Sequence, residues 1–289
     1  MNALAAYLQQ SSREVETLLD SLLPSEQTRP AILHQAMRYS LFAGGKRLRP
    51  ALCFAACEAC GGTRDQAVRP AAALEVLHTY TLIHDDLPAM DNDDLRRGKP
   101  TCHKIYGEAN AILAGDALLT LAFELLAGSD LEPARMVMEL AKAAGSTGVI
   151  AGQVEDIANE GQALDEDTLR FIHRHKTGDL IRAAVRLGVI ASGTDQALEP
   201  LTRYAEHVGL AFQIADDVLN ATSDSDTLGK AVGSDAQRGK QTFVAFLGLE
   251  KARREAERLV HEAVALLGDL PGPTAPLNDL AWHVIRRDR

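Results

Sequence analysis

Apolar residues recur at helical intervals through most of the chain. Leu4, Leu8, Val15 and Leu19 predict an amphipathic helix over residues 1–23 that ends at Pro24. Similar patterns predict further helices, including one from about residue 30 to the glycine pair at 44–45 and others over 51–60, 109–127, 133–151 and 200–219. No segment shows the alternation of a convincing strand. The pattern therefore predicts an all-α protein, which we expect to form a single domain over residues 1–289.

Composition supports this expectation and narrows the function. The chain is 46% hydrophobic and 24% charged, with only 4% aromatic residues, and alanine and leucine favour helices. A formal net charge of -10 argues against a general nucleic-acid or anionic-membrane surface. No apolar run reaches transmembrane length, and the N-terminus lacks the basic-then-apolar pattern of a signal peptide. We expect a cytoplasmic protein without a membrane span.

The four cysteines do not require a cofactor or a disulfide. Cys53, Cys57 and Cys60 have the CxxxCxxC spacing that holds an iron–sulfur cluster in radical enzymes. The surrounding sequence, ALCFAACEAC, is rich in alanine and helical, so the same spacing places the three thiols on one stripe of a helix. Cysteine behaves there as a small buried hydrophobe. We therefore favour core packing.

The most informative stretch runs from His84 to Lys99 and reads HDDLPAMDNDDLRRGK. Five aspartates in so short a segment repel one another and raise one another's pKa unless a cation lies between them. Mg²⁺ prefers carboxylate oxygens and is usually completed by substrate phosphates, which Arg96 and Arg97 would also suit. Pro88 interrupts the helix, and a distorted turn there would bring Asp91 back over Asp85. The alternative is a solvated acidic loop.

Other polar clusters lie far away in the sequence. Lys46, Arg47 and Arg49 follow the glycine pair in AGGKRLRP and form a second candidate anion site, or simply a solvated helix end. His78 lies two helical turns before Asp85 and is either a site residue or a core histidine. A second acidic pair, Asp216–Asp217, occurs in FQIADDVLN. Residues 224–241 form the longest polar stretch, which we interpret as a mobile flap.

Taken together, these motifs resemble one family. AGGKRLRP, HTYTLIHDDLPAMDNDDLRRGKP, GQVEDI, HKT, FQIADDVLN and GKQT are similar to the motifs of the trans-isoprenyl diphosphate synthases, and most of all to the bacterial type of farnesyl diphosphate synthase. The resemblance covers nearly the whole chain. It implies a helical bundle around a deep central cavity, a homodimer, three Mg²⁺ ions, and the condensation of isopentenyl diphosphate with an allylic diphosphate, either dimethylallyl or geranyl.

The resemblance also assigns roles to individual residues. It implies that Asp85, Asp86 and Asp91 form the first metal site and that Asp216 is a ligand of the opposing one. It implies that Arg96 grips the allylic diphosphate. The isopentenyl diphosphate site would comprise Lys46, Arg49, His78 and Arg97. Further diphosphate or allylic contacts would come from Lys176, Gln213, Lys230 and Lys240, with Thr177 lining the reacting end.

Two residues shortly before Asp85 are candidates for setting the product length. Tyr80 and Thr81 lie five and four residues before Asp85, where an aromatic resembles the cavity floor of synthases that make fifteen-carbon products. We expect farnesyl diphosphate as the main product; the alternative for Tyr80 is ordinary core packing.

Family members usually carry DDxxD at the second site, whereas this chain has Asn220, a neutral amide, in place of the last carboxylate.

Several alternative functions fit part of the pattern. Geranyl and geranylgeranyl diphosphate synthases differ from the favoured assignment only in product length. A class I terpene cyclase also uses an acidic metal motif but does not need the Lys46, Arg49 and His78 site. A non-catalytic partner subunit of a prenyl synthase is disfavoured by the intact first motif. Turnover of isopentenyl diphosphate by the purified chain discriminates these classes.

Overall fold

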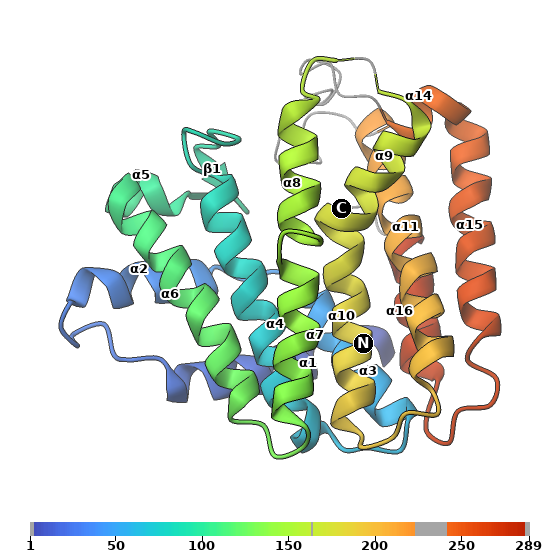
Figure 1. Ribbon diagram of the computed structural model, residues 1–289, viewed down its shortest axis with the longest axis horizontal. Coiled ribbons are helices and arrows are strands. Elements are labelled where there is room, and N and C mark those ends of the chain that lie inside the picture. The colour runs from blue at the N-terminus through green and yellow to red at the C-terminus, as the bar shows by residue number, and fades with distance from the viewer. Residues whose placement is uncertain (1–2, 163, 223–241, 287–289) are drawn as a thin grey trace.

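Long helices lying side by side make up the part of the chain that the computed structural model describes, residues 3–162, 164–222 and 242–286 (Figure 1). The prediction of an all-α fold is confirmed. The elements in order are α1 (Ala3–Leu22), α2 (Ala31–Leu41), α3 (Leu48–Ala59), α4 (Arg64–Asp85), β1 (Leu95–Arg96), β2 (Lys99–Pro100), α5 (Cys102–Tyr106), α6 (Glu108–Ala127), α7 (Pro133–Ala144), α8 (Val149–Ala158), α9 (Glu166–His173), the π-helix η1 (Arg174–Gly178), α10 (Asp179–Ala191), α11 (Leu198–Thr222), α14 (Phe243–Leu247), α15 (Leu249–Ala265) and α16 (Ala275–Arg286).

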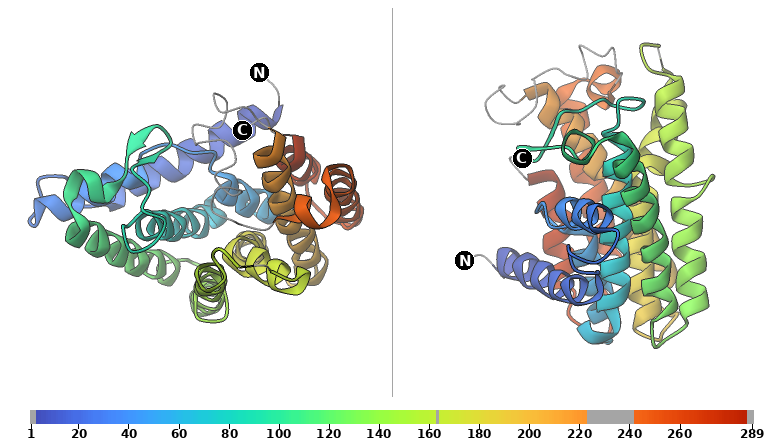
Figure 2. Two further views of the ribbon diagram at one scale, coloured as in Figure 1. Left: turned by 90° about the horizontal axis from the view of Figure 1, so that it is seen from above. Right: turned by 90° about the vertical axis from the view of Figure 1, so that its left-hand side faces the viewer.

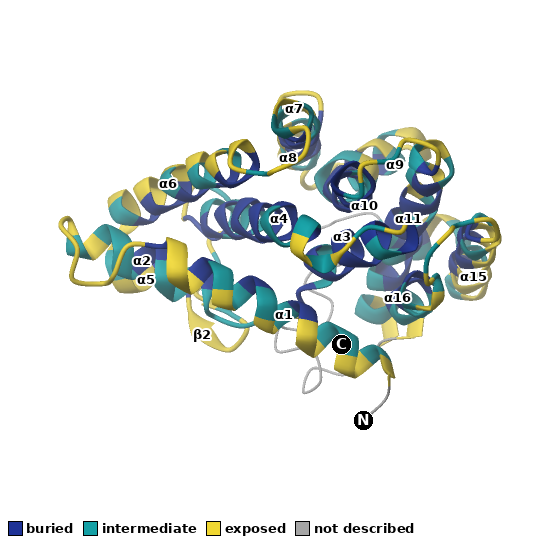
Figure 3. Ribbon diagram, turned by 90° about the horizontal axis from the view of Figure 1, so that it is seen from below, coloured by how far each residue is buried: buried dark blue, intermediate teal, exposed yellow. Residues whose placement is uncertain are grey.

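Helix α4 is the central element of the bundle. It packs against α1, α2, α3, α6 and α10. Figure 3 shows it enclosed by other helices when the molecule is seen from below. Its residues from Pro70 to Leu77 are all buried, which is typical of a helix surrounded on every side rather than of an amphipathic surface helix. Its C-terminal end, which carries His84 and Asp85, lies towards the top of the molecule in the view of Figure 1.

The cysteine stripe lies in the core, as expected. Cys53, Cys57 and Cys60 are buried on α3 as free thiols, and burial raises the pKa of each of them. Helix α3 packs closely on α10, where Gly188 permits the contact: a Cβ at this position would lie 2.2 Å from the carbonyl oxygen of Cys53. The stripe therefore packs one helix against its neighbours.

The helix expected over 133–151 is two helices, α7 and α8. The sequence between them contains Gly145 and Gly148. A Cβ at Gly148 would lie 2.0 Å from the carbonyl oxygen of Ala143, so the chain folds back more tightly there than a larger residue permits. The apolar periodicity continues across this break, which is why the sequence alone suggested one helix.

Helix α6 is the one helix in the described ranges that is long and apolar enough to cross a membrane, with a mean hydropathy of 1.5. Asp116 and Glu124 interrupt its apolar run. Its contacts with α4, α2 and α7 are those of a bundle helix, and Figures 1 and 2 show it beside α4 along much of its length. Only 39% of its most apolar window is buried, so the opposite face of α6 carries exposed apolar residues.

A short hairpin follows the acidic stretch. Strands β1 and β2 pair antiparallel, with Leu95 opposite Pro100 and Arg96 opposite Lys99. The turn residues Arg97 and Gly98 both have positive φ, 54° and 74°. Two residues per strand are too few to show an alternating pattern, so the sequence did not reveal these strands.

Candidate active site

The acidic stretch forms the distorted turn that its sequence predicted. Helix α4 ends at Asp85, and the backbone N–H of Asp91 donates a hydrogen bond to the carbonyl oxygen of Asp85 at 2.8 Å. Pro88, exposed between them, prevents the helix from continuing. The turn therefore brings residues six positions apart back into contact.

Asp85 opens into a chamber of about 480 Å³. Four elements build its walls: α4, the turn after α4, α8 and the η1–α10 segment, with Arg49 closing one side. Its lining residues are Arg49, His78, Tyr80, Thr81, Leu82, His84, Asp85, Met90, Val149, Ile150, Gln153, Val154, Ile157, Lys176, Thr177 and Leu180. The lining combines charged groups, among them Asp85, Lys176 and Arg49, with many apolar side chains, which suits a substrate with an anionic head and a hydrocarbon tail.

The carboxyl group of Asp85 is strongly perturbed. Its pKa is raised from 3.8 to about 6, mainly by burial and also by the nearby carboxylates of Asp91 and Asp86, against the opposite effect of Lys176 and Arg96. A buried carboxylate next to others of its kind is a good ligand for a divalent cation. Within the described ranges no three His, Cys, Asp or Glu side chains converge closely enough to hold a metal by themselves. A cation at Asp85 and Asp91 would therefore share its coordination with substrate oxygens and water, the arrangement that suits Mg²⁺.

Asp86 points elsewhere. Its carboxylate is buried and accepts hydrogen bonds from Arg96, with Nε 2.7 Å from Oδ1 and 2.8 Å from Oδ2, and Nη2 2.5 Å from Oδ1. The pair lines a separate small cavity under the hairpin rather than the chamber. Asp86, assigned to the metal site, and Arg96, assigned to the allylic diphosphate, thus contact each other. Their roles in metal and substrate binding stay predictions.

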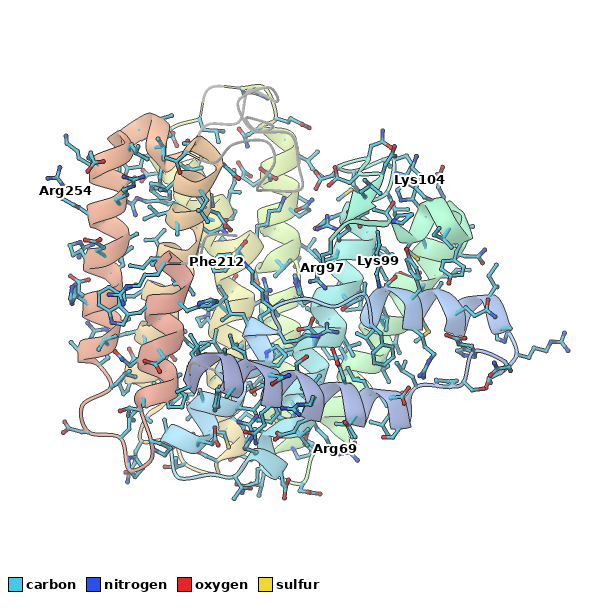
Figure 4. All side chains as sticks on the ribbon, turned by 180° about the vertical axis from the view of Figure 1, so that it is seen from behind. Arg69, Arg97, Lys99, Lys104, Phe212 and Arg254 are labelled. Carbon is cyan, nitrogen blue, oxygen red and sulfur yellow. The ribbon has the colours of Figure 1, made fainter. Side chains whose placement is uncertain are left out.

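The residues predicted for isopentenyl diphosphate do come together. Lys46, Arg49, His78 and Arg97 line a second cavity of about 400 Å³, which shares Arg49 and His78 with the chamber. Arg97 and Phe212 reach this cavity from different elements (Figure 4). The sharing of two wall residues places the two cavities next to each other.

Burial and mutual repulsion shape the charges of this second cavity. Burial lowers the pKa of Arg49 to about 10, and its Nε is buried without a hydrogen-bond partner. Burial and the neighbouring arginines hold the pKa of His78 well below its usual 6.5, so the imidazole is neutral at pH 7. Cations crowded in this way favour binding of an anion, because it relieves their repulsion.

The glycine pair shapes this cavity. The Arg97 guanidinium donates a hydrogen bond to the carbonyl oxygen of Gly44. A Cβ at Gly45 would lie 2.5 Å from Nη1 of Arg97, and Gly45 has a φ of 138°. The backbone angle therefore favours glycine at this position, and a larger residue would also displace the guanidinium of Arg97.

Arg47, the third member of the basic cluster, has a structural role. It is buried and pairs with the buried carboxylate of Glu75 on α4, and its Nη2 lies 3.0 Å from Glu16 and 2.7 Å from the carbonyl oxygen of Leu41. The sequence grouped it with its two basic neighbours. Nothing in the local pattern distinguishes it, because its partners lie in three other segments.

Lys176 lies in the π-helical segment η1 beside the chamber. Its ammonium group donates to Oδ2 of Asp156 on α8 at 2.6 Å and lowers the pKa of Asp85 across the chamber. Gly152 allows α8 to approach, because a Cβ there would lie 2.1 Å from the backbone nitrogen of Lys176. Single-turn π-helices are frequent at functional sites. Thr177, its neighbour, lines the chamber as predicted.

The two residues of the second acidic pair, Asp216 and Asp217, also have different surroundings. Asp216 on α11 raises the pKa of Arg49, a residue of the chamber wall. Asp217 is buried and accepts a hydrogen bond of 2.7 Å from the backbone N–H of Phe243, the first residue of α14. Gln213, one turn earlier, bonds to Nδ1 of His173 at 2.7 Å. Lys230 and Lys240, also predicted to contact substrate, lie outside the described residues, as does the stretch interpreted as a flap.

Tyr80 and Thr81 both line the chamber, in agreement with their predicted position. Thr81 donates its hydroxyl to the carbonyl oxygen of His78 at 2.8 Å, so its polar atom is satisfied. Residues that the sequence analysis missed complete the wall from α8, namely Val149, Ile150, Val154 and Ile157. Their apolar spacing on one helix was the available signal, but the same spacing also fits core packing.

Comparison with known proteins agrees with this geometry. The profile of the polyprenyl synthetase family matches residues 30–267. The farnesyl diphosphate synthase of Escherichia coli is 49% identical over 266 residues, covering 88% of this chain and 89% of that protein. Large subunit 1 of the heterodimeric chloroplastic geranylgeranyl pyrophosphate synthase of Arabidopsis thaliana is 48% identical over 294 residues, covering 98% of this chain and 79% of that protein.

Solved structures lead to the same family. The apo crystal structure of an FPP/GFPP synthase from Zymomonas mobilis superposes with a TM-score of 0.87 at 37% identity, covering 98% of both chains. A second structure, a putative farnesyl diphosphate synthase from Marinomonas, has a TM-score of 0.84 at 38% identity. The family inferred from the motifs is thus confirmed: the chain belongs to the polyprenyl synthetase family and is a prenyltransferase.

Proposed function

We propose that this single-domain chain condenses isopentenyl diphosphate head-to-tail with dimethylallyl or geranyl diphosphate and releases mainly farnesyl diphosphate. The observation that carries the proposal is the pair of adjoining cavities, one rich in arginine and one with Asp85 at its polar part and Tyr80 in its wall. Two adjoining anion sites suit a reaction that joins two diphosphates. The 49% identity to a farnesyl diphosphate synthase supports the product assignment.

The residues of the chain act in three ways. Lys46, Arg49 and Arg97 bind the diphosphate of the acceptor, and neutral His78 adds a hydrogen bond without further charge. Lys176 contributes positive charge near the leaving diphosphate. Apolar side chains of α8 and Leu180 exclude water from the allylic cation that forms when the carbon–oxygen bond breaks. The acceptor double bond attacks this cation, and the proton then lost goes to the departed diphosphate.

Asp85, Asp91 and Asp216 would hold the Mg²⁺ ions, three of them by resemblance to the family. When bound, Mg²⁺ stabilises the negative charge that develops on the departing diphosphate. The donor set fits, because a buried carboxylate with a pKa near 6 gains from an adjacent cation. Asn220 supplies an amide oxygen in place of a charge; Asn220→Asp should tighten Mg²⁺ binding without altering turnover if Asn220 is peripheral.

Product analysis tests the proposal directly. Purified protein is incubated with Mg²⁺, isopentenyl diphosphate and each short allylic diphosphate, and the products are separated by chromatography. We expect farnesyl diphosphate from the wild type and longer products from Tyr80→Ala, because removing the ring deepens the chamber. Tyr80→Phe keeps the ring and should keep the product. An unchanged product length in Tyr80→Ala would refute the floor role.

A geranylgeranyl product is the second candidate, since plant geranylgeranyl pyrophosphate synthases are 46% to 48% identical to this chain. A dominant twenty-carbon product from the wild type would establish it. Turnover of an allylic diphosphate without isopentenyl diphosphate would instead indicate a cyclase. No turnover by the purified chain would indicate a non-catalytic subunit.

We also propose that the chain acts as a homodimer in the cytoplasm. Ile112 and Leu113 are 43% and 55% exposed on α6, and much of this apolar helix is uncovered. A second copy would bury such a surface. Light scattering coupled to gel filtration should give twice the mass of one chain, and Leu113→Glu should shift it towards the monomer. A monomeric wild type would contradict the proposal.

A further inference from the structure

Helix α6 meets the chamber wall at His84, and Gly115 is the residue of closest approach. Gly115 is buried on the face of α6 that meets α4. The nearest atoms to a Cβ built at this position belong to the ring of His84: 2.2 Å to Nε2, 2.5 Å to Cδ2 and 3.0 Å to Cε1. A real Cβ contact is never this short, so the ring of His84 occupies space that exists only because residue 115 is glycine.

The ring of His84 is held in this space by further contacts. Nε2 lies 3.1 Å from the carbonyl oxygen of Ile112 on α6, to which it donates a hydrogen bond, and 3.9 Å from Oδ1 of Asp116. The Tyr80 ring packs edge-on against it, with the ring centroids 5.4 Å apart and the planes at 88°. Both His84 and Tyr80 line the chamber. No motif in the sequence points to Gly115.

We propose that Gly115 is a specificity-determining residue: by leaving room for the His84 ring against α6, it sets where Tyr80 stands and hence how long a hydrocarbon chain the chamber accepts. This inference rests on the proposed function. It places one determinant of product length on α6, a helix that contributes no side chain to the chamber lining.

The direction of the effect follows from the packing. The His84 ring meets the backbone of α6 at Gly115 and Ile112, packs edge-on against Tyr80 and lines the chamber. A methyl group at residue 115 therefore pushes the ring away from the Ile112 carbonyl, towards the chamber and against Tyr80. The volume open to the growing chain falls by about one methylene or more. In an apolar pocket, one methylene changes discrimination by about tenfold or more.

The test is the product distribution of Gly115→Ala with Mg²⁺, isopentenyl diphosphate and dimethylallyl diphosphate. We expect the ratio of ten-carbon to fifteen-carbon product to rise about tenfold over wild type. Gly128→Ala is the matched control, because it makes the same change at the residue that caps the C-terminus of α6. The nearest atom there is the flexible tip of Arg69, at 3.1 Å. Its product ratio should be that of wild type.

Two further variants keep the inference testable if Gly115→Ala folds poorly. The double variant Gly115→Ala/His84→Ala removes the ring that the methyl group strikes and should recover folding and products of at least fifteen carbons. His84→Ala alone should lengthen the products, because Tyr80 loses its support. A change of fold alone alters yield but not the product ratio.

The outcomes separate the two proposals. If the wild type makes no prenyl diphosphate, the proposed function is wrong. If the wild type makes farnesyl diphosphate and both Gly115→Ala and His84→Ala give the same product ratio, the inference about Gly115 is wrong and the proposed function stands.

Discussion

The Asp-Asp pairs at the end of α4 and near the end of α11 invite comparison, because in each the two carboxylates have different environments. Asp85 lines the chamber, and Asp216 raises the pKa of Arg49, another residue of the chamber wall. Their neighbours Asp86 and Asp217 are buried, 3% and 7% exposed. Adjacent residues on a helix point about 100° apart, so the two members of such a pair meet different surroundings.

The buried members differ in what they hold. Asp86 binds the guanidinium of Arg96 and so anchors the short hairpin beside the chamber. Asp217 binds the backbone N–H of Phe243 and so fixes the start of α14 to α11. A repeated acidic motif therefore does not imply that all of its carboxylates have the same task. In each pair one carboxylate holds a neighbouring segment in place, which leaves Asp85 and Asp216 as the proposed metal ligands.

The sharpest test of this division is Asp85→Asn. An amide keeps the shape but loses the charge that faces the chamber, so the turnover number should fall about 100- to 1,000-fold with little change in unfolding temperature. Asp94→Asn is the matched control, because Asp94 lies in the same acidic stretch with a side chain that is 72% exposed. Steady-state kinetics and thermal unfolding measure both. Equal losses of activity in the two variants would refute the special role of Asp85.

Asp86→Ala should act mainly on stability. It leaves the partly buried Arg96 without its bidentate partner, which we expect to lower the free energy of unfolding by about 2–3 kcal/mol in urea. Asp93→Ala should lower it less, since Asp93 lies 3.8 Å from Arg96, beyond hydrogen-bond distance. If Asp86→Ala abolished Mg²⁺ binding while leaving the stability unchanged, Asp86 would be a ligand and the comparison would fail.

The second pair should show the same separation on a smaller scale. Asp217→Ala leaves the buried N–H of Phe243 without its acceptor and should reduce the free energy of unfolding by about 1–3 kcal/mol. Asp216→Ala should reduce the turnover number and change the stability less. Measuring both variants by urea unfolding and kinetics decides the matter; the reverse pattern would exchange the two roles.

The smallest expected effect is on the pH dependence of folding stability. It concerns His78, which lies in the wall that the second cavity shares with the chamber. Burial and the arginines around it lower the pKa of His78 in the folded state. The unfolded chain therefore binds more protons below about pH 6.5, and stability falls as the pH is lowered through this range. His78→Gln should flatten this part of the stability curve in metal-free buffer. An unchanged slope would show that His78 is not buried among these cations.

The sequence by itself determined the helical class and the family, because helical spacing and each motif are local patterns. It also singled out several residues that line the two cavities, among them Asp85, Arg49 and Lys176. The buried cysteine stripe on α3 was also predictable, since its spacing matches a helix face.

Only the tertiary structure decided which member of each cluster faces the chamber. Arg47 and Glu75 pair across 28 residues, and Asp217 and Phe243 across 26, so no local pattern contains both partners. The contact of Gly115 with His84 likewise exists only because α6 and α4 pack against each other at these two residues. Periodicity fixes the face of a helix on which a side chain lies, but the neighbour on that face is set by packing between distant segments.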